Sequence, residues 1–154
     1  NVMVGRHVRT RAGLLGAMFQ TKATKAEEAA IRQRAMDLLH YVQIEDKADD
    51  LAKNLSYGDQ RRLEIARALA TEPKLLCLDE PAAGMNATET EELRELIVGI
   101  RKDGTTVLLI EHDVKLVMGL CDRVAVLDYG ALVIEDVPAV VQKDQRVIEA
   151  YLGA

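Results

Sequence analysis

Two apolar segments with a helical segment between them constrain the fold of this chain most strongly. Residues 75–78 are a short continuous apolar run, and residues 105–110 are a longer run rich in β-branched side chains. Residues 87–102 between them carry apolar side chains at helical spacing, with Asn86 and Glu89 as an N-cap pair and Gly104 after the helix. A strand, a helix and a strand in this order predict a βαβ unit with parallel strands. Continuous apolar runs further predict strands covered on both faces.

The rest of the chain predicts helices before this unit and a hairpin after it. Small and apolar residues recur at helical spacing over 25–42, which predicts a helix, and a second helix is expected over 61–70. Residues 6–25 show no firm period and are expected to be mobile or to depend on a partner. A helix over 114–121, a hairpin of strands 124–127 and 131–135, and a last helix over about 144–152 follow. We therefore expect a helical subdomain over 1–72, which includes the helix over 61–70, and the remainder of an α/β core over 73–154.

Composition limits the classes of function. The chain has 20 Lys and Arg against 25 Asp and Glu, a net charge of −5, which argues against a nucleic-acid-binding surface. No apolar run approaches the roughly 18 to 20 residues that a membrane-spanning helix needs. Cys77 and Cys121 have apolar neighbours, which predicts buried, reduced thiols and favours a cytoplasmic setting.

Polar residues follow both strands of the predicted βαβ unit. Asp79 and Glu80 come directly after the first strand, and His112 comes two residues after the second. Ligands bind at the carboxyl ends of such strands, where Mg²⁺ with a phosphate would offset the charge of two carboxylates and an imidazole could meet a terminal phosphate. Alternatively, the carboxylates only cap a strand end, and His112 only begins the next helix.

The segment before the helix over 61–70 is a candidate anion site. Ser56 is a good N-cap, and Gly58 in the first turn lets a ligand approach the unpaired backbone N–H groups. The alternative is that Ser56 and Asp59, three residues apart, form an ordinary capping box in a helix that binds nothing.

Four segments, taken together in their order and spacing, resemble the ATP-binding cassette (ABC) ATPases. Residues 55–60 (Leu-Ser-Tyr-Gly-Asp-Gln), 75–81, 83–86 (Ala-Gly-Met-Asn) and 110–113 (Ile-Glu-His-Asp) resemble that family's signature motif, Walker B strand, D-loop and switch histidine. Residues 61–68, 81–86, 114–118 and 147–153 are further similar to the ATP subunits of branched-chain amino acid importers. The implied fold is α/β, a partial P-loop NTPase (ABC ATPase) fold with a mainly parallel sheet and a helical subdomain.

The resemblance implies ATP and Mg²⁺ as cofactors and an ATPase activity coupled to transport. Asp79 would position Mg²⁺, often through water, Glu80 would polarise the attacking water, and His112 would contact the γ-phosphate. The signature would bind the ATP held by a second subunit, through Ser56, Tyr57, Gly58, Asp59 and Gln60. The D-loop residues Gly84 and Asn86 would lie on the dimer seam.

The resemblance also implies partners and a location. The partners are a second ABC ATPase subunit, membrane permease subunits and, indirectly, a solute-binding protein, with no nucleic acid. The chain would lie in the cytoplasm, peripherally on the cytoplasmic face of the inner or plasma membrane.

Two features depart from the family pattern. Asp59 stands where the signature commonly carries Gln, which brings a carboxylate near a triphosphate unless Asp59 turns back to cap its own helix. None of the ten glycines is followed by lysine, so the phosphate-cradling G-x-x-x-x-G-K-[ST] loop is absent from these residues. We therefore expect the C-terminal portion of a longer ATPase, inactive alone. The alternatives are a non-catalytic or split ABC-type domain that supplies the signature in trans, or a non-transport ABC ATPase.

Overall fold

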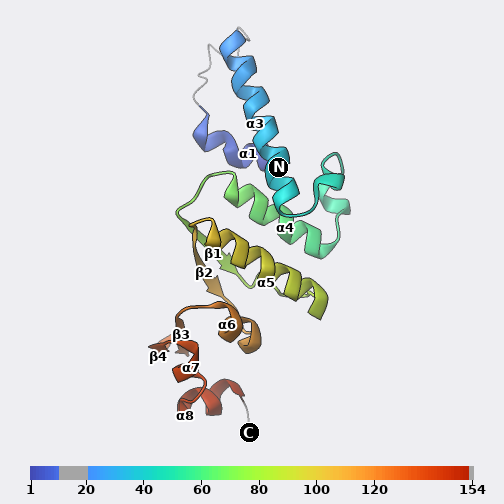
Figure 1. Ribbon diagram of the computed structural model, residues 1–154. Helices are drawn as coiled ribbons and strands as arrows, with labels where there is room; N and C mark the ends of the chain where they lie inside the picture. The colour runs from blue at the N-terminus through green and yellow to red at the C-terminus, as the bar shows by residue number, and fades with distance from the viewer. Residues whose placement is uncertain (11–20, 153–154) are drawn as a thin grey trace. The chain divides into compact units, whose positions relative to one another are not determined.

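The computed structural model describes residues 1–10 and 21–152 (Figure 1). The chain divides into two compact units. The first unit comprises Asn1–Leu76 and Arg101–Val107, and the second comprises Cys77–Ile100 and Leu108–Ala154. Residues 11–20, the middle of the segment expected to be mobile, lie outside the described residues. The division expected between residues 72 and 73 stays a prediction.

Helices build most of the first unit. Helix α1 (Val2–Arg6) continues into the 3₁₀ turn η1 (His7–Arg9), and α1 packs on both α3 (Lys22–Tyr41) and α4 (Tyr57–Leu69), which also pack on each other. Two further 3₁₀ turns, η2 (Glu45–Lys47) and η3 (Ala52–Asn54), connect α3 with α4. The buried apolar side chains of these elements and their connections are Val2, Ala35, Leu38, Leu39, Val42, Ile44, Ile65, Ala66 and Ala70.

Side-chain caps determine where the two long helices of this unit begin. The Thr21 hydroxyl accepts a hydrogen bond from the Thr24 backbone N–H at 3.2 Å, so α3 begins at Lys22, three residues before the predicted start. The Ser56 hydroxyl accepts from the Asp59 N–H at 3.2 Å, so α4 begins at Tyr57 rather than at residue 61. Helix α1 was not predicted, because five residues are too few to show a period.

The predicted βαβ unit is present. Strands β1 (Leu75–Asp79) and β2 (Thr106–Ile110) pair with each other, and α5 (Ala87–Lys102) connects them. The Thr106 N–H donates to the Lys74 carbonyl at 3.0 Å and the Glu80 N–H to the Ile110 carbonyl at 2.8 Å. The partner numbers rise together along both strands, so the pair is parallel.

The prediction that these strands are covered on both faces is wrong for the described residues. Burial alternates along both strands, and the exposed fractions of Leu75, Leu108 and Ile110 are 53%, 52% and 57%. The Cys77 thiol, expected to be buried, is exposed on the same pattern. Two strands form this sheet, and no layer of the described residues covers the side that carries these apolar side chains.

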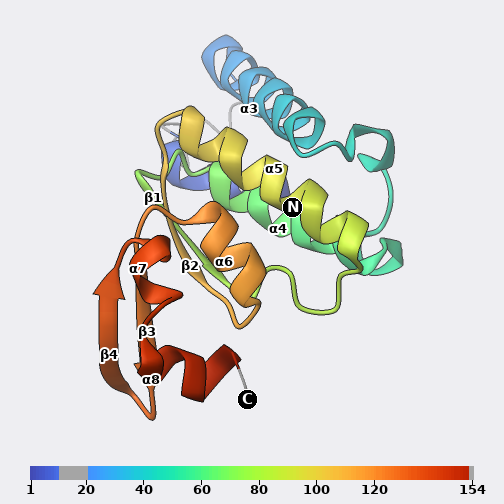
Figure 2. The same ribbon diagram turned by 60° about the horizontal axis from the view of Figure 1, so that its bottom comes forward.

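The second unit contains the predicted hairpin. Strands β3 (Val124–Asp128) and β4 (Ala131–Asp136) pair antiparallel, and Figure 2 shows them joined by a tight turn. Short helices α6 (Val114–Leu120), α7 (Pro138–Val141) and α8 (Gln145–Val147) and a π-helical turn (Ile148–Leu152) complete the unit, so the last predicted helix is interrupted after Val147. Its core contains Val124, Val126, Val141 and Val147, with Val117, Met118, Cys121, Val133 and Ile134 partly buried against them.

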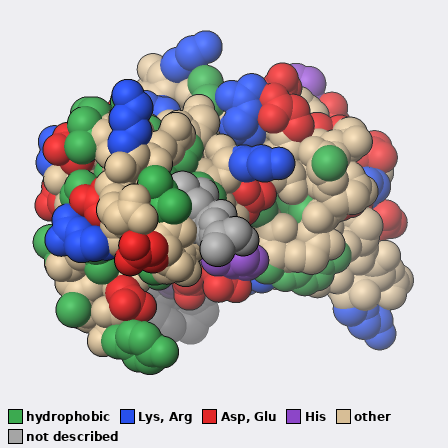
Figure 3. Space-filling view, turned by 90° about the horizontal axis from the view of Figure 1, so that it is seen from below, with side chains coloured by type: hydrophobic (Ala, Val, Ile, Leu, Met, Phe, Trp, Pro, Cys, Tyr) green, Lys and Arg blue, Asp and Glu red, His purple; other side chains and the backbone are tan. Residues whose placement is uncertain are grey.

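We examined the described residues for a membrane-spanning helix and the face drawn in Figure 3 for a separation of charge by sign. Among residues 1–10 and 21–152, no helix combines the length and the apolar character needed to cross a bilayer. On the face drawn in Figure 3, the described Lys and Arg side chains lie among Asp and Glu side chains. This mixture agrees with the weakly acidic net charge of −5.

Candidate functional site

The second unit brings Glu80 and His112 together. Glu80 follows β1 and His112 follows β2 by two residues, so both lie at the carboxyl end of the parallel pair. The His112 Nδ1 atom lies 3.5 Å from the Glu80 Oε1 atom, with 70% and 54% of the two side chains exposed. A carboxylate and an imidazole that both reach solvent at this distance can bind the same water molecule.

Asp79 is the last residue of β1 and is exposed beside Glu80. No group of three or more His, Cys, Asp or Glu side chains in the described ranges is arranged to hold a metal ion. Mg²⁺ is commonly bound through only one or two carboxylates, with waters and substrate phosphates as the other ligands. Asp79 therefore fits Mg²⁺ as a single protein ligand that needs a phosphate to complete the site.

Glu111, between β2 and His112, is a buried carboxylate that sequence reasoning missed. Its side chain is 1% exposed. Its Oε1 atom accepts from the Ala82 N–H at 2.8 Å and its Oε2 atom from the His112 N–H at 3.2 Å. Burying a charge is costly unless hydrogen bonds compensate, and these two backbone donors do so. The signal that could have found Glu111 is its type, since an acidic residue directly extends an apolar strand.

The segment identified with the D-loop is an ordered turn that ends in a helix cap. Gly84 has a φ of +75°, a left-handed conformation that glycine adopts without strain. The Asn86 side-chain oxygen accepts from the N–H groups of Thr88 at 2.9 Å and Glu89 at 3.0 Å, and the Glu89 carboxylate accepts from the Asn86 N–H at 2.9 Å. The predicted N-cap pair at the start of α5 is therefore confirmed, as a reciprocal capping box.

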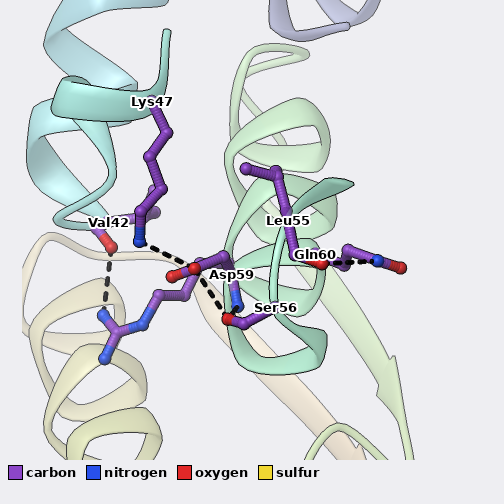
Figure 4. A network of polar contacts seen from close by, with 7 residues as sticks. Val42, Lys47, Leu55, Ser56, Asp59 and Gln60 are labelled. Atoms are coloured by element: carbon purple, nitrogen blue, oxygen red, sulfur yellow. Dashed lines mark hydrogen bonds and ion pairs between the residues drawn. The ribbon is translucent and has the colours of Figure 1, made fainter. Parts of the chain in front are cut away.

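The signature segment lies in the first unit, around the N-terminus of α4 (Figure 4). Ser56 and Tyr57 are exposed, whereas Gly58 is buried. The Gln60 amide donates to the Leu55 carbonyl at 3.0 Å. Arg61 donates to the Tyr57 hydroxyl from Nε and Nη2 at 3.2 and 2.7 Å and lies over its ring at 5.1 Å. Neighbouring groups therefore order the side chains of this segment.

Asp59 turns back toward the start of its own helix, as expected, but its partners differ from a simple capping box. Its Oδ2 atom accepts from the Ser56 hydroxyl at 2.6 Å and from the Lys47 ammonium at 2.7 Å (Figure 4). Burial raises the pKa of Asp59, but the hydrogen bonds from Lys47 and Ser56 and the charges of Lys47 and Arg62 outweigh burial, so the pKa lies below its ordinary value. Lys47 thus compensates the charge of the Asp59 carboxylate within the segment that the sequence predicts as an anion site.

Comparisons with known proteins match two segments of the chain to family models and most of the chain to known relatives. Residues 4–83 match a family model described as "ABC transporter", and residues 135–154 match one described as "Branched-chain amino acid ATP-binding cassette transporter". The chain is 44% identical, over 99% of its length, to the high-affinity branched-chain amino acid transport ATP-binding protein LivG of Salmonella typhimurium. It is 42% identical, over the same share, to BraF of Pseudomonas aeruginosa, which carries the same description.

Solved structures agree with these matches. The structure of cbiO1 from Clostridium perfringens, described as part of the ABC transporter complex cbiONQ, superimposes with a TM-score of 0.75 at 30% identity. That superposition covers 97% of this chain and 54% of cbiO1. The chain likewise spans 60% of the length of LivG and of BraF.

Proposed function

Because the chain belongs to the ABC transporter family, we propose that it acts within an ATP-binding and ATP-hydrolysing subunit of an importer for branched-chain amino acids. Its α/β fold is that of the ABC ATPase cassettes, a P-loop NTPase fold. The substrate class is supported by the descriptions of LivG and BraF and by the match of residues 135–154.

The observation that carries the catalytic proposal is the 3.5 Å contact between Glu80 Oε1 and His112 Nδ1 at the ends of two paired strands. A water molecule attacks the γ-phosphate, and Glu80 accepts a proton from that water. His112 donates a hydrogen bond to the γ-phosphate or orients the water. A positioned general base contributes roughly 10²- to 10⁴-fold in rate.

The cofactors of this proposal are ATP and Mg²⁺. Asp79 would hold the ion directly or through water, which agrees with its exposed position beside Glu80. When bound, Mg²⁺ supplies positive charge to the phosphate oxygens of ATP. The residues described above supply the base and the orienting imidazole and do not cradle the triphosphate, because no glycine in the sequence precedes a lysine.

The partners follow from the remaining site residues. In a dimer of ATPase subunits, the signature residues Ser56, Tyr57, Gly58, Asp59 and Gln60 face the ATP of the second subunit, and Gly84 and Asn86 lie at the seam. Exposed Ser56 and Tyr57 are accessible for this contact, and Lys47 neutralises Asp59 beside them. We further propose membrane permease subunits and, indirectly, a solute-binding protein as partners, with the chain at the cytoplasmic face of the membrane.

The test uses the product of the complete reading frame that encodes these residues. Glu80→Gln should leave ATP affinity within about threefold and lower kcat by about 10²-fold or more, because the amide cannot accept the proton. Glu95→Gln, on the exposed side of α5, is the matched control and should keep the wild-type kcat. Hydrolysis by Glu80→Gln at the rate of this control would contradict the role of Glu80.

The substrate class needs a separate measurement. The ATPase is reconstituted with the permease and the solute-binding protein of its transporter, and ATP hydrolysis is followed as leucine, valine or lysine is added. Leucine and valine should stimulate hydrolysis, and lysine should not. Stimulation by lysine alone would reject the branched-chain assignment while leaving the ATPase proposal intact.

A further inference from the structure

The Glu111 carboxylate joins two loops, one after each strand of the parallel pair. Its Oε1 atom bonds the N–H of Ala82, two residues after Glu80, and its Oε2 atom bonds the N–H of His112. We propose that Glu111 is a positioning residue for the catalytic pair, whose buried carboxylate sets the distance between Glu80 and His112. This inference rests on the function proposed above for those two residues.

The contact between Glu111 and Ala82 holds the chain next to Glu80, whose backbone conformation is strained. Glu80 has a φ of +44°, a left-handed conformation that is strained for a non-glycine residue. Hydrogen bonds hold the chain on both sides of the strained residue: the Glu80 N–H donates to the Ile110 carbonyl at 2.8 Å, and the Ala82 N–H donates to Glu111. The second bond therefore keeps Glu80 in the orientation that brings its carboxylate to His112.

The chemistry of the contact requires a carboxylate. The two groups that hydrogen-bond to Glu111 are backbone N–H donors, and the His112 Nδ1 atom lies 3.8 Å from its Oε2 atom. A carboxylate is the side chain that offers two acceptor oxygens and no donor. A glutamine would accept from one amide and turn its own NH₂ toward the other. With 1% of the side chain exposed, water cannot replace the lost bond. Because the side chain is buried, Glu111 acts through Glu80 and His112 rather than by touching the nucleotide.

The test is a double-mutant cycle in the product of the complete reading frame, with ATP hydrolysis measured for Glu111→Gln, His112→Ala and the double variant. A displacement of about 1 Å costs up to 10²-fold, so Glu111→Gln should lower kcat about 10- to 100-fold and keep KM for ATP within about twofold. Because Glu111 acts through both residues, the loss of kcat in the double variant should be smaller than the product of the two single losses. Glu95→Gln again serves as the charge-matched control.

Two results would overturn the proposal: a wild-type kcat in Glu111→Gln, or losses that multiply in the double variant. If Glu111→Gln does not fold, Glu111→Asp replaces it, because the shorter side chain cannot reach both amides and should show the same selective loss of kcat. A wild-type kcat in the Asp variant would then reject the positioning role.

A second readout does not depend on hydrolysis. The amide protons of Ala82 and His112 are followed by ¹H–¹⁵N NMR and hydrogen exchange in the same protein. Glu111→Gln should speed exchange at one of the two amides at least tenfold, and unchanged exchange at both would overturn the proposal. If the wild-type protein hydrolyses no ATP, the proposed function fails, whereas this readout still decides whether Glu111 holds the two loops.

Discussion

At the scale of single residues, Lys47 compensates the charge of Asp59 in the first turn of α4. The Asp59 carboxylate lies 2.7 Å from the Lys47 ammonium, and the two side chains are 17% and 34% exposed. Burial raises the pKa of Asp59, but the hydrogen bonds and nearby cations hold it below the ordinary value of 3.8. The hydrogen bond that Lys47 donates to Asp59 raises the pKa of Lys47 above its ordinary value of 10.5, and burial lowers it by less.

This pair predicts a pH-dependent effect of Lys47→Met. Because the pKa of Asp59 is lowered, its contribution to stability is present above the ordinary value of 3.8 and is lost as the pH falls through the lowered pKa. Because the pKa of Lys47 is raised, its contribution is lost only above 10.5. Lys47→Met should therefore destabilise the chain by about 1 kcal/mol near neutral pH, and this difference should shrink below pH 4. Urea unfolding from pH 2.5 to 8 measures it.

The control is Lys53→Met in η3, an exposed lysine of the same unit. Its difference from the wild type should change little with pH. A Lys47→Met difference that stays constant down to pH 2.5 would show that the pair contributes no charge-dependent stability.

At the scale of elements, α1 and α4 approach each other at a position where only glycine fits. A Cβ atom on Gly5 would lie 2.2 Å from the Arg67 carbonyl oxygen and 3.1 Å from its carbonyl carbon. Both atoms belong to the backbone of α4, so they cannot turn aside as a side chain would. Arg9, just beyond α1, donates to the Thr71 and Glu72 carbonyls at 2.8 and 3.1 Å and so supports the end of α4.

Gly5→Ala should therefore separate α1 from α4 and cost about 1 to 3 kcal/mol. Gly119→Ala in α6 is the matched control, because nothing lies within 4 Å of its added Cβ. That control should be neutral or should stabilise the chain by about 0.5 to 1 kcal/mol, since alanine loses less backbone entropy in a helix. Equal unfolding free energies of the two variants in urea would contradict the close approach.

The hairpin turn offers a substitution that should stabilise the chain. Tyr129 and Gly130 have φ values of +44° and +80°, as a two-residue turn between β3 and β4 requires, and the Tyr129 side chain is fully exposed. Tyr129→Asn should raise stability by about 0.5 to 1 kcal/mol, because asparagine tolerates this conformation and no packing is lost. Gly130→Ala should lower it. Thermal unfolding checks both signs, and a destabilised Tyr129→Asn would contradict the turn geometry.

At the scale of the whole molecule, the two units each carry a different part of the proposed nucleotide machinery. Ser56 to Gln60 belong to the first unit, whereas Asp79, Glu80 and His112 belong to the second. The strands β1 and β2 contribute residues to both units, and their alternate apolar side chains are exposed. The chain spans 60% of the length of LivG and BraF.

We expect the 154-residue chain by itself to release no phosphate from ATP above the blank, because it has no Gly-Lys sequence to cradle a triphosphate. Phosphate release is measured with the isolated chain and with the product of the complete reading frame side by side. Release by the isolated chain that Glu80→Gln abolishes would contradict this expectation and would place a phosphate cradle within these residues.

Local patterns were enough to determine most elements and their ends. The period of residues 87–102, the Asn86 cap and Gly104 placed α5 at Ala87–Lys102, because helix caps and spacing act within one turn of the chain. The two apolar runs placed both strands of the parallel pair within a residue, and the order of the motifs placed the chain in its family. The placement of two carboxylates and an imidazole after paired strands was likewise predicted from residue type and position, and their chemical roles stay a prediction.

The tertiary structure alone decided the contacts between residues far apart in sequence. The pairing of Lys47 with Asp59 and the bond from Ala82 to Glu111 join positions 12 and 29 residues apart, and no local period encodes them. Exposure was decided in the same way: Cys77 lies in an apolar run yet is exposed, because burial depends on which layers cover a strand and not on the strand's own composition. Packing brings such groups together, and a residue's partners and exposure are therefore properties of the folded chain.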